Sequence, residues 1–126
     1  MSPVWLDERA GDLRVIASSA PAELRVALEG SADVLAEAAF AALVTRIDEE
    51  ARRVGPREVV LDICGLEFMN SSCFKSVISW LLAVRRLPAE SRYTMRLRVD
   101  ANVYWQRRSL TALAFFGGDA VVIDQV

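Results

Sequence analysis

Ser71 and Ser72 are two adjacent hydroxyls placed between an apolar stretch and an amphipathic one. Residues 58–63 predict a strand, and residues 72–87 predict a helix. The first backbone N–H groups of a helix have no partner within the helix and carry a partial positive charge. Ser71 is therefore either a plain N-cap or a position where a negative group, such as a phosphate, is accommodated.

The residue types in this sequence do not favour catalysis, metal binding or cofactor binding. The chain has no histidine, which excludes Ser-His-Asp and Cys-His catalysis and the common zinc sites. Lys75 is the single lysine and no glycine-rich phosphate loop precedes it. Cys64 and Cys73 lack metal or redox spacing and predict two buried, reduced thiols. We therefore expect no catalytic residue, no metal and no cofactor.

Length and composition predict one domain that occupies residues 1–126, with its core at about 12–124. The chain has 126 residues, of which 53% are hydrophobic, which is typical of a packed globular domain. The apolar runs are too short to span a bilayer, so no membrane contact is expected. The first eight residues lack the basic start and apolar core of a signal peptide, which favours the cytoplasm.

The charge is divided unevenly along the chain. Residues 1–67 hold 13 acidic residues and 7 arginines, whereas residues 68–126 hold 8 basic and 4 acidic residues. This asymmetry is either solvated surface or an electrostatic footprint for a partner. Tyr104, Trp105, Arg107 and Arg108 lie together near the start of a predicted helix. Such aromatic residues are more often packing residues than nucleic-acid contacts, and a net charge of −2 argues against a nucleic-acid partner.

The hydrophobic periodicity predicts an α/β fold with the element order ββαβαβαβ. Strands are expected at residues 13–17, 24–28, 58–63, 93–100 and 120–124, and helices at residues 34–54, 72–87 and about 102–116. The first two strands form a hairpin, and the alternation that follows implies right-handed crossovers. The result is a mixed, mainly parallel sheet of about five strands with three main helices, and strand 58–63 is placed centrally.

Two surfaces follow from these patterns. Along helix 72–87, Cys73, Trp80, Val84 and Leu87 widen the apolar arc beyond one buried face, either for a neighbouring helix or for a partner. Along strand 93–100, Arg96 and Arg98 alternate with apolar residues, so they predict a solvated basic face that could steer an acidic partner.

Residues 59–82 resemble the signature of STAS domains of the anti-sigma-factor antagonist type. That signature is an apolar strand ending in Asp, then Phe-Met-Asp-Ser-Ser, then an amphipathic helix. This chain has Leu61-Asp62 and Phe68-Met69-Asn70-Ser71-Ser72. The resemblance implies a bacterial signalling regulator, not an enzyme, in which Ser71 is the phosphoacceptor and Ser72 the reserve.

The resemblance also implies the partners. They would be a GHKL-type serine kinase that also acts as an anti-sigma factor, and a PP2C-type phosphatase that reverses the modification. The expected partner-binding residues follow the same stretch of chain: Asn70, Ser71, Ser72, Cys73, Lys75, Ser76 and Trp80.

Two residues depart from the family pattern. Asn70 stands where the family has Asp, and Cys73 stands where it has Gly. Asn70 can still cap a helix but carries no charge, which indicates a divergent branch. A second hypothesis therefore stays open, in which the chain is a STAS-like scaffold that is never phosphorylated and that assembles with other STAS chains or with copies of itself.

Overall fold

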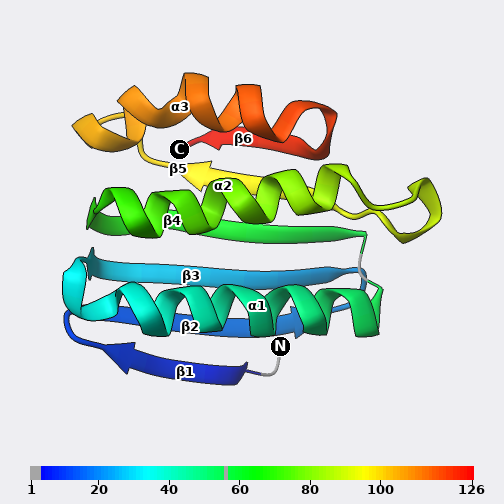
Figure 1. Cartoon of the computed structure of the whole chain (residues 1–126), viewed down its shortest axis with the longest axis horizontal. Helices are drawn as coiled ribbons and strands as arrows, with labels where there is room; N and C mark the ends of the chain where they lie inside the picture. The colour runs from blue at the N-terminus through cyan, green and yellow to red at the C-terminus, as the bar shows by residue number, and fades with distance from the viewer. Residues whose placement is uncertain (1–3, 56) are drawn as a thin grey trace.

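The computed structural model describes residues 4–55 and 57–126. Within these residues, one six-stranded sheet has its strands in sequence order, and three helices lie against it (Figure 1). The strands are β1 (Val4–Ala10), β2 (Leu13–Ala20), β3 (Glu23–Ala32), β4 (Glu58–Met69), β5 (Thr94–Val99) and β6 (Val121–Gln125). The helices are α1 (Glu37–Val54), α2 (Ser71–Arg85) and α3 (Tyr104–Gly117), and the short 3₁₀ turns are η1 (Val34–Ala36), η2 (Ala89–Ser91) and η3 (Gly118–Ala120).

The sheet combines an antiparallel half with a parallel half. Strands β1, β2 and β3 pair as an antiparallel meander, whereas β3, β4, β5 and β6 are parallel neighbours. The mixed α/β fold and the central position of β4 are thereby confirmed. The expected count of about five strands is low by one, because residues 4–10 form the edge strand β1. Its side chains are mostly exposed and only Leu6 is buried, so its hydrophobic period is weak.

The three helices cover one face of the sheet, and the core lies between the helices and that face (Figure 1). Alternate strand residues point into it, such as Val59 and Leu61 of β4 and Met95 and Leu97 of β5. The buried side of α1 consists of Phe40, Leu43, Ile47 and Ala51. None of the helices among the described residues has the length and apolar character needed to span a membrane.

The opposite face of the sheet carries arginines that are paired with carboxylates. Arg96 donates to Glu58 Oε1 at 2.9 Å and to Asp124 Oδ1 at 3.0 Å. Arg98 lies 3.4 Å from Asp62 Oδ2, and both arginine side chains are 33% exposed. The two arginines are partly exposed on this face as predicted, but the face is not basic, because their charges are paired. Since each arginine already faces acidic side chains on neighbouring strands, Arg96 and Arg98 offer little unpaired charge to steer an acidic partner.

The ends of the helices are formed in different ways. Gly55 ends α1 in the left-handed conformation, with φ of 71°, as a C-terminal glycine does; Pro56 lies outside the described residues. Asp33 caps η1, and α1 itself begins only at Glu37. Asp100 and Asn102 do not cap α3, because Asp100 Oδ1 accepts from the Asn102 N–H and the helix begins two residues later.

Candidate functional site

The three βα turns of the parallel half lie at one end of the sheet, which we call the carboxyl rim. It comprises η1 after β3, the start of α2 after β4 and the start of α3 after β5, all at the left of Figure 1. Ligands of open α/β sheets bind at this end of the strands. Four large hydrophobic side chains stay exposed here, namely Val34, Leu35, Phe68 and Tyr104. The predicted Ser71 site therefore lies on the rim and not on the open face of the sheet.

Asn70 is the residue that fixes the start of α2. Its Oδ1 accepts from the Cys73 N–H at 2.9 Å, which makes Asn70 the N-cap. Its Nδ2 donates to Glu37 Oε1 at 2.6 Å, and its backbone N–H donates to the Ala32 carbonyl at 2.8 Å. One side chain thus joins the start of α2 to the start of α1. An Asp at this position would lack the donor and would place a second carboxylate against Glu37.

Ser71 is the first residue of α2, and both Ser71 and Ser72 are exposed. Because Asn70 supplies the cap, the expectation of a Ser71 N-cap is wrong. Within the described residues, no hydrogen bond engages the Ser71 hydroxyl, whereas the Ser72 carbonyl accepts from Ser76 Oγ at 3.4 Å. The Ser71 hydroxyl is therefore exposed at the rim and takes part in no hydrogen bond among the described residues.

Two of the expected partner contacts are core residues instead. Cys73 is 1% exposed and Trp80 is 3% exposed. Trp80 Nε1 donates to Tyr93 Oη at 2.8 Å, and that hydroxyl donates in turn to Asp48 Oδ1 of α1 at 2.6 Å. This corrects the expectation that Cys73 and Trp80 meet a partner directly. Of the two explanations for the wide apolar arc of α2, packing against other elements of the chain holds for both side chains.

Both cysteines are free thiols, but only Cys73 is fully buried, whereas Cys64 is partly exposed. Burial raises the pKa of the Cys73 thiol. At Cys64, burial and the hydrogen bond with Asp62 raise the pKa to about 11. Both thiols therefore stay protonated near neutral pH and are poor nucleophiles.

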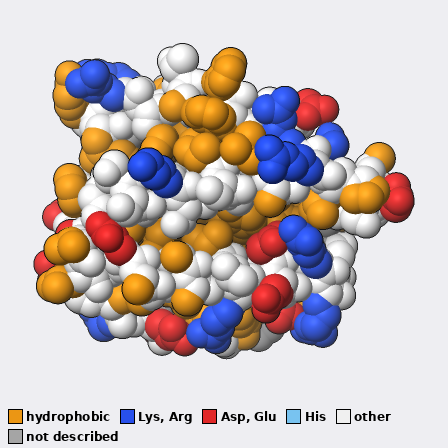
Figure 2. Space-filling model, in the orientation of Figure 1, with side chains coloured by type: hydrophobic (Ala, Val, Ile, Leu, Met, Phe, Trp, Pro, Cys, Tyr) orange, Lys and Arg blue, Asp and Glu red, His pale blue; other side chains and the backbone are white. Residues whose placement is uncertain are grey.

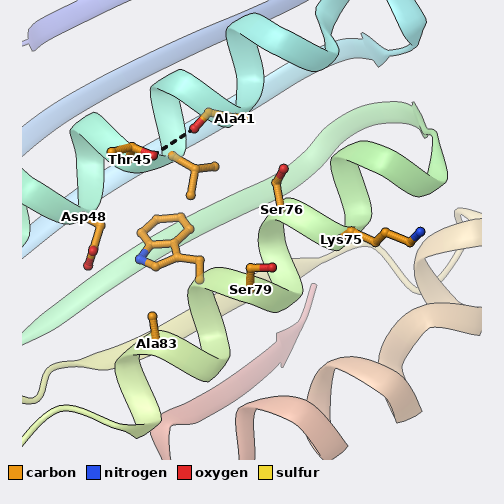
Figure 3. A pocket seen from close by; sticks show the side chains of 9 residues that line it. Ala41, Thr45, Asp48, Lys75, Ser76, Ser79 and Ala83 are labelled. Atoms are coloured by element: carbon orange, nitrogen blue, oxygen red, sulfur yellow. Dashed lines mark hydrogen bonds between the residues drawn. The ribbon is translucent and has the colours of Figure 1, made fainter.

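Lys75 and Ser76 lie beside a groove between α1 and α2 (Figure 3). The groove has a volume of about 360 Å³, and small side chains such as Ala41, Ser79 and Ala83 keep it open. In Figure 3 the side chain of Lys75 extends away from α1. Lys75 and Ser76 are thus on the same surface as Ser71 and Ser72, and a partner seated on the start of α2 can reach all four.

A second groove separates the start of α2 from α3. Its volume is about 500 Å³, and it is lined by Met69, Ser71, Phe74, Tyr104, Trp105, Arg108, Ser109 and Ala112. The guanidinium carbons of Arg107 and Arg108 each lie 5.6 Å from the centre of the Tyr104 ring. Figure 2 shows basic side chains gathered over the start of α3 and acidic ones over the start of α1. Ser71 therefore lies between an acidic and a basic part of the rim.

Gln106 is a site-positioning residue that the sequence analysis missed. It is fully buried, and its Nε2 donates to the carbonyls of Ile63 and Leu66 at 2.6 and 3.0 Å. Its Oε1 accepts from the Asp100 N–H at 2.8 Å. The irregular part of β4 is thereby held to the start of α3, a few residues before Ser71. The available signal was a polar residue in line with Leu110 and Leu113, at spacings of four and three on the inward side of α3.

Asp62 lies at the same irregularity of β4. Its Oδ1 accepts from the Cys64 N–H at 3.0 Å, and the register of β4 against β3 shifts just beyond it. Asp62 therefore supports the backbone of β4 at this irregularity. Its carboxylate is on the open face of the sheet, beside Arg98, and not at the rim.

Replacing Asn70 by Asp will lower the free energy of unfolding by about 1–2 kcal/mol at neutral pH, because the cap survives but the donor to Glu37 is replaced by a like charge. The double variant Asn70→Asp, Glu37→Gln will recover most of this loss. The deficit of the single variant will shrink as pH falls through the range in which carboxyl groups protonate. Urea unfolding of the parent, the single variant and the double variant measures this, and an Asn70→Asp chain as stable as the parent would contradict it.

The comparisons with known proteins bear on the fold. No family model matches the sequence, and no curated protein matches it. Among solved structures, the crystal structure of an anti-sigma factor antagonist from Mycobacterium paratuberculosis is similar, with a TM-score of 0.65 at 15% sequence identity. The match covers 94% of this chain and 92% of that chain. The chain therefore has the STAS fold of anti-sigma factor antagonists.

Proposed function

We propose that this STAS-fold chain is a regulator that binds a protein partner through its carboxyl rim and is switched by phosphorylation of Ser71. The observation that carries the proposal is the placement of the Ser71 hydroxyl. It is exposed at the first position of α2, and Asn70 performs the capping that would otherwise occupy it. The exposed hydrophobic side chains Phe68 and Tyr104 lie on the same rim, and such side chains are common in protein-binding surfaces.

The partner class follows from the resemblance of the Ser71 stretch and from the fold. We propose a GHKL-type serine kinase that is also an anti-sigma factor, with a PP2C-type phosphatase to remove the phosphate. The solved structure of similar fold is named as an anti-sigma factor antagonist, which supports this class. The direct contacts would be Asn70, Ser71, Ser72, Lys75 and Ser76, in a bacterial cytoplasm and without catalysis by this chain.

The chemistry of the switch is electrostatic. A phosphoserine adds about −1.5 to −2 charge at neutral pH. The start of α2 tolerates that charge, because helix N-termini stabilise anions by roughly 0.3–1 kcal/mol. The fold would therefore be retained. A partner that packs closely against Phe68 and Ser71 would instead meet a hydrated dianion, and it would bind less well.

The second candidate is an unmodified assembly module. Val34 and Leu35 are 71% and 76% exposed, and they lie on the rim but on a different turn from Ser71. Such side chains suit a permanent contact with another STAS chain or with a second copy of this one. This candidate uses the same rim but assigns no role to the Ser71 hydroxyl.

The test is to incubate the chain with GHKL-type serine kinases of its own organism and Mg-ATP, and then to map phosphate by peptide mass spectrometry. The switch requires phosphate on Ser71 and its loss in Ser71→Ala. Ser72→Ala is the matched control and should be modified normally. A chain that purifies only with copies of itself or other STAS chains, and that no such kinase modifies, would support the assembly module.

A further inference from the structure

We propose that Arg108 binds the phosphate of phosphorylated Ser71, so that modification of α2 is transmitted to the start of α3. The inference rests on the proposed phosphorylation of Ser71 and adds a receiving residue to it. Its basis is the groove between the two helices, which Ser71 and Arg108 line from opposite sides.

The charges on the two sides of Ser71 determine where a phosphate on this residue would lie. On the α1 side of Ser71 lies Glu37, which already accepts the hydrogen bond from Asn70 Nδ2. A dianion is repelled from that side. On the α3 side, the groove is lined by Arg108 and by neutral side chains such as Tyr104, Trp105 and Ser109. The phosphate is therefore expected to lie toward α3.

Arg108 is suited to receive it. The residue is exposed, and within the part of the chain that the structure describes no carboxylate forms an ion pair with it. Its guanidinium rests against the Tyr104 ring, with 5.6 Å from carbon to ring centre. A charge-assisted, bidentate bond to phosphate is stronger than an exposed cation–π contact, so the guanidinium would turn from the ring to the phosphate.

Movement of Arg108 from the Tyr104 ring to the phosphate would change a part of the surface that Ser71 does not occupy. Tyr104 is 62% exposed and lies under both arginines. When Arg108 leaves the ring, the exposed aromatic face and the positive charge at the start of α3 both change. A partner that spans α2 and α3 would then detect phosphorylation at two places, through the dianion and through the rearranged Tyr104 side.

Arg107 provides a matched control. It has the same charge as its neighbour and the same 5.6 Å distance to the Tyr104 ring, but it does not line the groove. Lys75 is the competing cation, since it lies four residues after Ser71 on the same helix and extends away from α1 (Figure 3). The experiment therefore compares three single variants, Arg108→Gln, Arg107→Gln and Lys75→Gln.

The test is to produce the full chain with phosphoserine installed at position 71 during translation and to titrate the phosphate by ³¹P NMR. A guanidinium in contact will hold the second pKa of the phosphate lower by about half a unit or more than in Arg108→Gln. Arg107→Gln should leave that pKa unchanged, and Lys75→Gln should raise it less than Arg108→Gln does. Equal values in the parent and in Arg108→Gln, or a larger rise in either of the other two variants, would overturn the proposal.

The same experiment separates this inference from the proposed function. The phosphate is installed without a kinase, so the titration reports on Arg108 whether or not a kinase recognises the chain. An Arg108 effect with no kinase able to modify Ser71 would remove the switch and leave the contact. If the kinase modifies Ser71 but Arg108→Gln does not change the pKa of the phosphate, the switch would remain and the Arg108 contact would be excluded.

Discussion

Trp80→Ala is expected to lower the free energy of unfolding by about 3–5 kcal/mol, the usual loss when a buried aromatic side chain is removed. Trp80 is 3% exposed and lies in the core between the helices and the sheet. The substitution also removes the donor to Tyr93 Oη, which itself donates to Asp48. Burial is the main cause that raises the pKa of Tyr93, and the hydrogen bond with Asp48 is the second. The phenol therefore stays neutral and can donate to Asp48.

Two further variants separate packing from hydrogen bonding. Trp80→Phe keeps most of the ring and removes the N–H donor, so it should cost about 1–2 kcal/mol. Ser79→Ala, at the exposed neighbouring position of α2, should change stability by less than about 0.5 kcal/mol. Urea denaturation gives all three values. A Trp80→Ala chain that keeps its stability but fails to bind its partner would restore the interface role that the burial of Trp80 argues against.

Ser71→Asp is expected to leave the fold unchanged and to weaken partner binding by tens to thousands of times. A charge buried without a partner in a protein interface costs about 2–5 kcal/mol, which corresponds to that range of affinity. Ser71→Ala removes the hydroxyl without adding charge and should bind like the parent. The cause of the difference is local, because Ser71 projects from the rim and takes no part in the cap of α2.

Calorimetric titration of the kinase partner measures the affinities, and thermal unfolding verifies the fold of each variant. Thr111→Asp is the matched control, since it adds the same charge at an exposed position of α3 that lines neither groove. Equal affinity of the partner for the parent, Ser71→Asp and the phosphorylated chain would contradict the proposed switch. Equal losses in Ser71→Asp and Thr111→Asp would mean that total charge, not the site, decides binding.

The sequence predicted the features that depend on local periodicity. The alternation around Val59 and the helical spacing after Ser71 were sufficient to predict β4, α2 and the hydroxyls between them. The edge strand β1 was missed because an edge strand buries little, and Leu6 alone gives no period. The sequence left open whether Ser71 caps the helix, since Asn, Ser and Ser are all good caps and only the backbone geometry selects Asn70.

Other features could not be predicted because they depend on the pairing of residues far apart in the chain. Arg96 is an exposed, basic residue by alternation, but its charge is matched by Glu58 and Asp124 on adjacent strands. Asn70 has a use for its amide because α1 places Glu37 beside it. Register and crossover geometry bring these partners together, and hydrophobic patterning along one segment does not specify them.

The sheet face that no helix covers limits which substitutions the chain can accept during evolution. Val60, at its centre, is 1% exposed although no helix covers it, and Arg25 and Arg96 are its direct neighbours on β3 and β5. The long arginine side chains can shield it, while Arg25 pairs with Glu23 of its own strand and Arg96 pairs with carboxylates of β4 and β6. Such pairs depend on opposite sign and on length, not on a fitted shape, so sign-exchanged pairs would serve as well. Positions 58 and 96, or 62 and 98, are thus expected to change together over evolutionary time, while the helix-covered face drifts more slowly.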